Sequence, residues 1–231
     1  WSRLPGVYVP SLFKVRYHDG GDPQVIALND VQPRVERALL PNLDHADFPS
    51  APIVPFGRPV HDPLRLELAP GCTRGCRFCQ AGMIYRPVRE RAPETVMNQC
   101  EQALKTTGYE DISLLSLSTG DYRCIAPLME KMIHRYACDH VALSLPSLRA
   151  GTLTPELMQI IKQVRKTGFT IAPEAGSQRL RDIINKNLTR DSIETTVEHA
   201  MALGWKNIKL YFMIGLPDET DADIEAICDL S

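Results

Sequence analysis

From residue 64 to the end of the chain, short apolar runs alternate with longer stretches that carry helix-start and helix-stop signals. Regular alternation of this kind predicts an α/β fold with a parallel sheet and right-handed crossover connections. The pattern alone fits both an open sheet and a barrel. No Gly-x-Gly-x-x-Gly follows a strand, which argues against a dinucleotide-binding domain. Strands are expected at residues 64–69, 111–117, 141–145, 169–172 and 206–214, and helices at 93–107, 122–137, 154–168, 177–203 and 218–230.

Capping residues delimit several of these helices. Gly108 lies just past the end of the first, Thr154 caps the third, and Gly168 closes the third. The stretch 177–203 is expected to hold one or two helices, with a restart at Thr189.

The first 60 residues differ from the rest, because they contain 9 of the 18 prolines, and each proline bars a helix at its position. Residues 12–18 and 24–28 are expected to form a hairpin around a turn at 19–22. We therefore expect an amino-terminal arm or interdomain connector over residues 1–60 and the main domain over residues 61–231. The chain does not begin with Met, which suggests a piece of a longer protein.

The bulk composition excludes several functional classes. The chain is 44% hydrophobic and 23% charged, as is typical of a globular protein, and no apolar run is long enough to span a membrane. The first residues do not resemble a signal peptide. The formal net charge of −2 provides no global basic field for nucleic acid.

Three cysteines stand close together in the long loop after the first expected strand. Cys72, Cys76 and Cys79 are separated by three and two residues, and thiolates at this spacing suit an iron–sulfur cluster. Three protein ligands leave one iron of a 4Fe–4S cluster open for another ligand. A structural zinc site is the alternative, but it needs a fourth ligand, and His61 and Cys100 stand at no zinc-finger spacing. An oxygen-sensitive cluster also favours a reducing cytoplasm.

The pattern Cys-x-x-x-Cys-x-aromatic-Cys, with Phe78 in the aromatic place, resembles the signature of the radical S-adenosylmethionine (SAM) enzymes. The longer run GCTRGCRFCQAGMIYRPVRER resembles a branch that has a cobalamin-binding-type domain upstream and a domain of unknown function downstream. The resemblance implies a partial TIM barrel of six strand–helix units. Five are visible here, so the last strand is expected to be missing or to lie beyond this chain.

The resemblance also implies a chemistry. A 4Fe–4S cluster would bind SAM at its open iron and receive an electron from a low-potential donor. SAM cleavage would then give a 5′-deoxyadenosyl radical that abstracts hydrogen from a substrate. The branch favours methyl or group transfer, with RNA as one substrate class. Cobalamin would take part through a domain absent from this chain, and the upstream and downstream domains would be partners.

The residues that follow each strand are the candidate SAM ligands, because parallel strands place ligands at their carboxyl ends. The turn after the second strand resembles the family's Gly-Gly-Glu-like turn for the methionine amino group, but it keeps one glycine and shortens the acid. Asp121 could still accept from an ammonium. The alternative is an ordinary turn of small residues. The turn comprises Ser118, Thr119, Gly120 and Asp121.

Polar residues also follow the third and fourth strands. Arg149 could bind a carboxylate of SAM or substrate, or it could be a solvated surface arginine. The resemblance makes Glu174 the candidate for the ribose hydroxyls, and a helix cap is its other reading. Arg179, one helical turn further on, could pair with the methionine carboxylate.

The fifth strand ends in Ile214 and Gly215, which resemble the family motif near adenine and would pack on the base together with Phe78. Ordinary core packing is the alternative for Phe78 and Ile214. Cys124 follows Asp121 closely and is a candidate substrate thiol or hydrogen-atom donor, although a buried cysteine acting as a small hydrophobe is the simpler interpretation.

A non-catalytic iron–sulfur module, serving electron transfer or scaffolding, is the alternative function. Both functions need the three cysteines, but only the enzyme needs the SAM site. Production of 5′-deoxyadenosine after anaerobic reconstitution would separate them.

Overall fold

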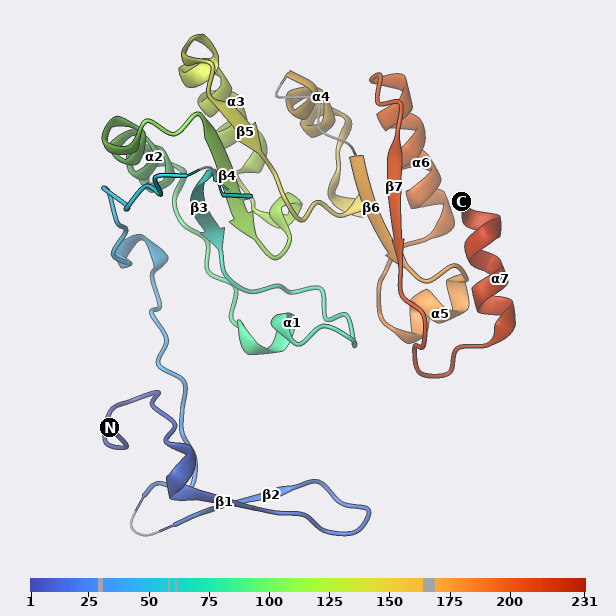
Figure 1. The fold of residues 1–231 in the computed structure, drawn as a ribbon. Coiled ribbons are helices and arrows are strands. Elements are labelled where there is room, and N and C mark those ends of the chain that lie inside the picture. Colours follow the sequence, from blue (N-terminus) through green and yellow to red (C-terminus); the bar gives the residue numbers. More distant parts are fainter. Residues whose placement is uncertain (29–30, 58, 61, 164–168) are drawn as a thin grey trace. The chain divides into compact units, whose positions relative to one another are not determined.

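The computed structural model describes residues 1–28, 31–57, 59–60, 62–163 and 169–231 (Figure 1). The chain divides into two compact units, Trp1–Pro41 and Asn42–Ser231. We call them the amino-terminal unit and the α/β unit.

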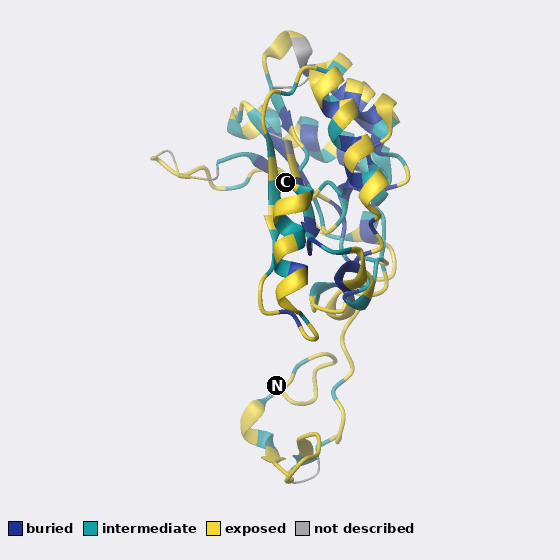
Figure 2. Ribbon diagram, turned by 90° about the vertical axis from the view of Figure 1, so that its right-hand side faces the viewer, coloured by how far each residue is buried: buried dark blue, intermediate teal, exposed yellow. Residues whose placement is uncertain are grey.

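The amino-terminal unit contains the expected hairpin. Strands β1 (Phe13–Arg16) and β2 (Gln24–Ala27) pair antiparallel, with Phe13 opposite Ala27. The short 3-10 turn η1 (Pro10–Leu12) precedes β1. No described residue of this unit is buried, as its yellow and teal colouring in Figure 2 shows. The unit therefore has a hairpin but no hydrophobic core.

The α/β unit contains the five expected strands, all in parallel pairs. They are β3 (Leu64–Ala69), β4 (Asp111–Ser116), β5 (Ala142–Ser144), β6 (Phe169–Glu174) and β7 (Ile208–Phe212). Strands β3, β4 and β5 form one sheet in that order, and β6 and β7 form a second.

The expected parallel pairing is therefore confirmed, whereas the described strands do not show the expected partial barrel. These strands form two parallel sheets, and they do not close into a barrel. The expected strand 141–145 forms a ladder over Ala142–Ser144 alone, and the chain then bends into the 3-10 turn η5 (Ala150–Thr152). A strand this short provides only a short hydrogen-bonding edge.

The helices follow the capping signals closely. The first expected helix is observed over the expected residues, and Gly108 ends it with a left-handed φ of 68°. The stretch 177–203 holds two helices, and the Thr189 hydroxyl caps the second by accepting from Ser192 N. The expected stop at Gly168 lies outside the described residues. The helices are α1 (Ala81–Ile84), α2 (Pro93–Thr107), α3 (Ile125–Tyr136), α4 (Pro155–Gln163), α5 (Gln178–Ile183), α6 (Arg190–Ala202) and α7 (Asp221–Leu230).

One hydrophobic core connects the two sheets. Alternate residues of β3 point into it, and Leu114 of β4 and Ile171 of β6 are buried in the same cluster. Helix α2 packs on β3, and helix α6 packs on β6. Burial of apolar surface thus holds together sheets that share no hydrogen-bond ladder among the described residues.

The turn after β6 is organised by a buried arginine. The side chain of Arg181 is 1% exposed, and it donates to the carbonyl oxygens of Ala175, Gly176 and Leu188 at 3.0, 2.7 and 3.0 Å. A guanidinium can satisfy several carbonyls at once because its donors lie in a fixed fork. Burial lowers the pKa of Arg181. This side chain fixes the path of the chain from β6 into α5.

Helix α7 is anchored through Asp223, which is 3% exposed. Thr220 and Asp223 form a capping box, and the Ser177 hydroxyl and the Arg179 guanidinium also donate to the Asp223 carboxylate. Hydrogen bonds from Ser177, Arg179 and Thr220 hold the pKa of Asp223 well below its usual range. The carboxylate therefore joins α7 to the start of α5.

We expect the contribution of Asp223 to depend on pH in one direction. A carboxyl group whose pKa is depressed by folding stabilises the fold fully above its ordinary pKa of 3.8, and the contribution is lost as the pH falls through the folded-state value. Urea unfolding followed by circular dichroism should show Asp223→Asn less stable than wild type at about pH 7, with a gap that narrows below about pH 4. Glu225→Gln, on the exposed face of α7, is the control and should show no such gap. A gap independent of pH would contradict the assignment.

Removal of Arg181 should destabilise the α/β unit strongly. Arg181→Met removes the hydrogen bonds to three carbonyl oxygens, so the free energy of unfolding measured in urea should fall by about 3 kcal/mol. Arg190→Met removes an exposed pair with Glu194 on α6 and should leave the free energy of unfolding almost unchanged. Equal effects of the two substitutions would mean that Arg181 does not organise the turn.

Candidate functional site

The cysteine loop, residues 71–88, starts directly after β3. Gly71 has a φ of 96°, and a Cβ there would lie 2.4 Å from the Tyr85 carbonyl oxygen, so only glycine permits this loop to close on itself. Within it the Cys79 amide donates to the Cys76 carbonyl at 3.1 Å. Helix α1, which the sequence did not predict, forms the far side of the loop.

Cys72, Cys76 and Cys79 are free thiols of intermediate burial. Among the described residues, no group of three or more Cys, His, Asp or Glu side chains is gathered closely enough to hold a metal ion. The donor chemistry of the loop still fits an iron–sulfur cluster, since three part-exposed thiols lie on one short segment. Of the zinc-ligand candidates, Cys100 is fully buried in the core, and His61 lies outside the described residues.

The loop is tied to the end of β4 by an ion pair. Arg74 Nε donates to Asp121 Oδ2 at 2.8 Å, and Arg74 Nη2 contacts the other carboxylate oxygen. Burial acts to raise the pKa of Asp121, but the hydrogen bonds from Arg74 and Ser118 and the charges of Arg74 and Arg149 together lower the pKa overall. Asp121 is therefore a carboxylate already paired with a cation.

The turn that carries Asp121 is a tight 3-10 turn, η3 (Thr119–Asp121), directly after Ser118. Thr119 is fully buried, and its hydroxyl donates to the Pro146 carbonyl at 2.6 Å. A Cβ at Gly120 would lie 2.1 Å from Thr152 Oγ1, so the single glycine of this turn is required by close packing. Thr119 thus anchors the turn in the core.

Arg149 brings a second cation to the cysteine loop. Its Nη1 donates to Cys76 Sγ at 3.8 Å. Its Nη2 is buried and has no hydrogen-bond partner in the part of the chain that the structure describes. A buried donor without a partner costs free energy unless a ligand or water accepts from it. The Arg149 guanidinium is therefore suited to receive an anion beside Cys76.

Glu174 lies at the end of β6 with a φ of 70°. Lys186 Nζ donates to Glu174 Oε1 at 2.9 Å, and the two side chains are 9% and 16% exposed. The same ammonium lies 5.7 Å from the centre of the Phe78 ring. Glu174 is thus linked through Lys186 to the aromatic residue of the cysteine motif.

The residues after β7 lie next to Glu174 in the sheet, because the Glu174 carbonyl accepts from Met213 N at 2.8 Å. Ile214 is 75% exposed, which argues against core packing as the role of this residue, and Phe78 is 36% exposed. Gly215 has a φ of 86°, and its amide donates to Glu219 Oε1 at 2.9 Å.

Two candidates have other neighbours in the fold. Arg179 pairs with Asp223 and donates to the Asp218 carbonyl at 2.9 Å, and no contact with the cysteine loop is among its described interactions. Cys124 directly precedes α3, is partly buried, and packs against the hydrophobic core. Their expected roles stay predictions.

Three residues that contact the loop or its motif were not predicted from the sequence. Arg74 lies between Cys72 and Cys76, and its positive charge was the one feature of the sequence that could have indicated a pairing with an acidic residue. Asn185 Nδ2 donates to the Gly75 carbonyl at 2.8 Å, and Lys186 contacts Phe78, although more than a hundred residues separate each pair in the chain. No local pattern announces contacts at that separation.

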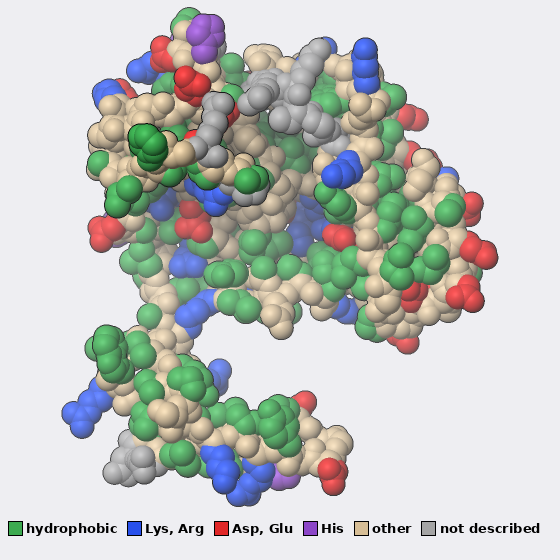
Figure 3. All heavy atoms as spheres, in the orientation of Figure 1, with side chains coloured by type: hydrophobic (Ala, Val, Ile, Leu, Met, Phe, Trp, Pro, Cys, Tyr) green, Lys and Arg blue, Asp and Glu red, His purple; other side chains and the backbone are tan. Residues whose placement is uncertain are grey.

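The surface over the cysteine loop is apolar with basic side chains nearby, as Figure 3 shows in the orientation of Figure 1. Met83, Ile84 and Tyr85 are 64%, 52% and 49% exposed. This exposed apolar group lies next to the thiols in the sequence.

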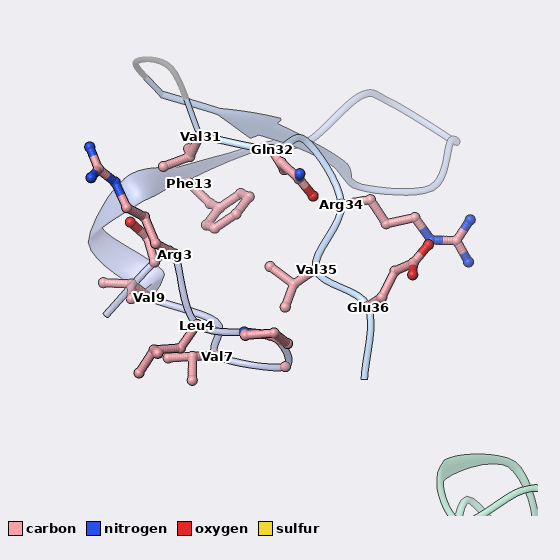
Figure 4. Close-up of a pocket in the computed structure, with 13 residues that line it drawn as sticks. Arg3, Leu4, Val7, Val9, Phe13, Val31, Gln32, Arg34, Val35 and Glu36 are labelled. Atoms are coloured by element: carbon pink, nitrogen blue, oxygen red, sulfur yellow. The ribbon is translucent and has the colours of Figure 1, made fainter. Parts of the chain in front are cut away.

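The amino-terminal unit contains a cavity of about 630 Å³ (Figure 4). Phe13 and Val35 point into it, whereas the charged ends of Arg34 and Glu36 point away. Among the described residues that line it, no charged groups converge in this cavity, so it is not the candidate site. None of the helices that the structure describes is both long and apolar enough to cross a membrane.

Known proteins resemble this chain in sequence. The uncharacterised protein MJ0966 of Methanocaldococcus jannaschii is 42% identical over 166 residues, which cover 72% of this chain and 36% of that protein. The ribosomal protein uS12 methylthiotransferase RimO of Thermoanaerobacter sp. is 24% identical over 69% of this chain and 38% of that protein. The tRNA-2-methylthio-N(6)-dimethylallyladenosine synthase of Solibacter usitatus is 25% identical over 71% of this chain and 39% of that protein. The matches thus extend over less than two-fifths of each relative's length.

A solved structure shares the fold. TsrM from Kitasatospora setae, a radical S-adenosylmethionine methyltransferase with cobalamin and a 4Fe–4S cluster bound, superposes with a TM-score of 0.60. The likeness covers 72% of this chain and 34% of that chain at 14% identity. Residues 66–231 match the family model described as the Radical SAM superfamily. Because this match covers more than half of the sequence, the chain belongs to the radical SAM superfamily.

Proposed function

We propose that this chain is the radical SAM domain of a methyl- or group-transfer enzyme, with Cys72, Cys76 and Cys79 as the ligands of its 4Fe–4S cluster. Membership in the superfamily implies the cluster and SAM as cofactors. When bound, the cluster supplies the electron that cleaves SAM into methionine and a 5′-deoxyadenosyl radical, which takes hydrogen from the substrate. A low-potential donor must provide that electron.

One observation carries the proposal: the cysteine loop contacts the residues that follow β4 and β5, and it is linked through Lys186 to the end of β6. Arg74 pairs with Asp121 after β4, and Cys76 accepts from Arg149 after β5. Phe78 faces Lys186, which is bonded to Glu174 at the end of β6. A SAM molecule needs groups for its amino acid, its ribose and its base, and these strand ends provide them beside the thiols.

The chain's residues would divide the ligand between them. Arg149 has a buried donor with no partner among the described residues, and it would bind the carboxylate at the methionine end of SAM, beside Cys76. Glu174 would accept from the ribose hydroxyls, and Ile214, Gly215 and Phe78 would pack on adenine. The remaining candidates are assigned to the methionine end of SAM. Asp121 would bind the ammonium, together with the turn residues Ser118, Thr119 and Gly120. Arg179 would bind the carboxylate.

The larger protein is also part of the proposal. We infer that the two sheets are parts of a partial TIM barrel of six strand–helix units, that residues 1–60 form a connecting arm, and that the protein works in the cytoplasm. The methylthiotransferase relatives are named for a ribosomal protein and for tRNA, so a macromolecular substrate, RNA included, is favoured here. Cobalamin would enter through a domain outside this chain, as the resembling branch suggests.

Anaerobic reconstitution tests the function directly. The reconstituted chain should bind about four irons and, with dithionite and SAM, release 5′-deoxyadenosine. Replacing Cys72, Cys76 and Cys79 together with Ala should abolish both the iron and the product, because the cluster loses its thiolates. Cys138→Ala, at an exposed position, is the matched control and should keep both. Full iron in the triple variant would overturn the ligand assignment, and iron without 5′-deoxyadenosine would favour an electron-transfer or scaffold module.

The ribose assignment has its own test. Glu174→Gln keeps the size of the side chain but removes its charge, so hydrogen bonds to the ribose hydroxyls should weaken and SAM affinity should fall about tenfold. Titration of the reduced cluster with SAM, followed by electron paramagnetic resonance, measures this affinity. Glu198→Gln, on the exposed face of α6, is the control. Wild-type affinity in Glu174→Gln would show that the ribose is held elsewhere.

A further inference from the structure

A short segment, residues 183–187, begins at the last residue of α5 and contacts the cysteine loop repeatedly. The Arg77 amide donates to the Ile184 carbonyl at 2.9 Å, and the Arg77 guanidinium donates to the Ile183 carbonyl. Asn185 donates to the Gly75 carbonyl at 2.8 Å. These bonds involve the loop residues on either side of Cys76, so the segment holds the part of the loop that carries the motif.

Lys186 stands at the centre of this segment and is nearly buried, with a side chain 9% exposed. Its ammonium bonds Glu174 Oε1 at 2.9 Å and lies 5.7 Å from the Phe78 ring centre. A buried ammonium requires compensation, and here a carboxylate and an aromatic face provide it. One cation therefore connects the end of β6 with the aromatic residue of the cysteine motif.

The backbone around Lys186 is held in an unusual conformation. Asn185 and Asn187 have φ values of 54° and 51°, and Glu174 has 70°. Left-handed conformations are costly for residues other than glycine, although asparagine tolerates them best. The Lys186 amide donates to the Arg181 carbonyl at 2.9 Å, which fixes the lysine between the two asparagines. Strain of this kind persists where surrounding structure imposes it, and it clusters at functional sites.

We propose that Lys186 is a positioning residue of the SAM site. It bonds one oxygen of Glu174 and leaves Oε2, which has no hydrogen-bond partner among the described residues, to accept from a ribose. It also holds Phe78 and the Cys76–Cys79 turn against the end of β6. Lys186 acts through Glu174 and Phe78 and does not itself contact the reacting atoms. The role toward SAM rests on the proposed function, whereas the role in ordering the loop belongs to the chain alone.

Hydrogen–deuterium exchange on the cluster-free chain tests the ordering of the loop. In Lys186→Met the amides of residues 74–79 should exchange about tenfold faster than in wild type, while those of β4 stay unchanged. Lys186→Arg keeps the charge and should restore most of the protection. Lys209→Met is the matched control, because Lys209 also lies over an aromatic ring, Tyr211 at 5.3 Å, but on β7. Unchanged exchange in the loop, or equal acceleration in β4, would overturn the ordering role.

Binding of S-adenosylhomocysteine to the same cluster-free chain, measured by calorimetry, tests the role toward the nucleoside. Affinity should fall about tenfold in Lys186→Met, and no further when Glu174→Gln is added, because the two side chains act as one unit. Additive losses, or tighter binding by Lys186→Met, would overturn this role. If wild type does not bind the probe, the proposed nucleoside site fails, while the exchange experiment still decides whether Lys186 orders the loop. Lys186→Gln serves if Lys186→Met does not fold.

Discussion

The candidate site depends on how the cysteine loop, which carries several arginines, is held against the carboxyl ends of parallel strands. The cysteine loop leaves β3 and makes no ladder with any described strand, so its position comes from side chains. Arg74 reaches Asp121 after β4, and Phe78 reaches Lys186, which bonds Glu174 at the end of β6. The core beneath these contacts is continuous between the two sheets, which keeps the strand ends close to this one loop.

The charged side chains beside the cysteine loop differ in whether they have partners, and this difference indicates which ligand groups they could bind. Both acidic candidates are paired, Asp121 with Arg74 and Glu174 with Lys186. Arg149 has a buried nitrogen with no partner among the described residues. The site is therefore prepared for an anionic group beside Cys76, while an incoming ammonium has to share Asp121 with Arg74. A zwitterionic amino acid end, such as that of SAM, could meet both demands at once.

The family match and the local geometry give different information about the same site. The family match covers residues 66–231 and identifies the domain. The structure adds two features that the family match does not contain. Residues 183–187 bind the cysteine loop, and Arg181 fixes the turn between Glu174 and α5. Supporting contacts of this kind decide whether ligand-binding groups stand in a usable arrangement.

The sequence by itself determined the strand–helix order, the caps at Gly108 and Thr189, the hairpin and the family, because these features are written in local spacing. It did not determine the break between β5 and β6, since a strand's ladder depends on which neighbour lies beside it. Nor could it reveal Lys186, whose importance arises from Phe78 and Glu174. The contact with Phe78 joins residues more than a hundred positions apart, and only tertiary packing brings them together.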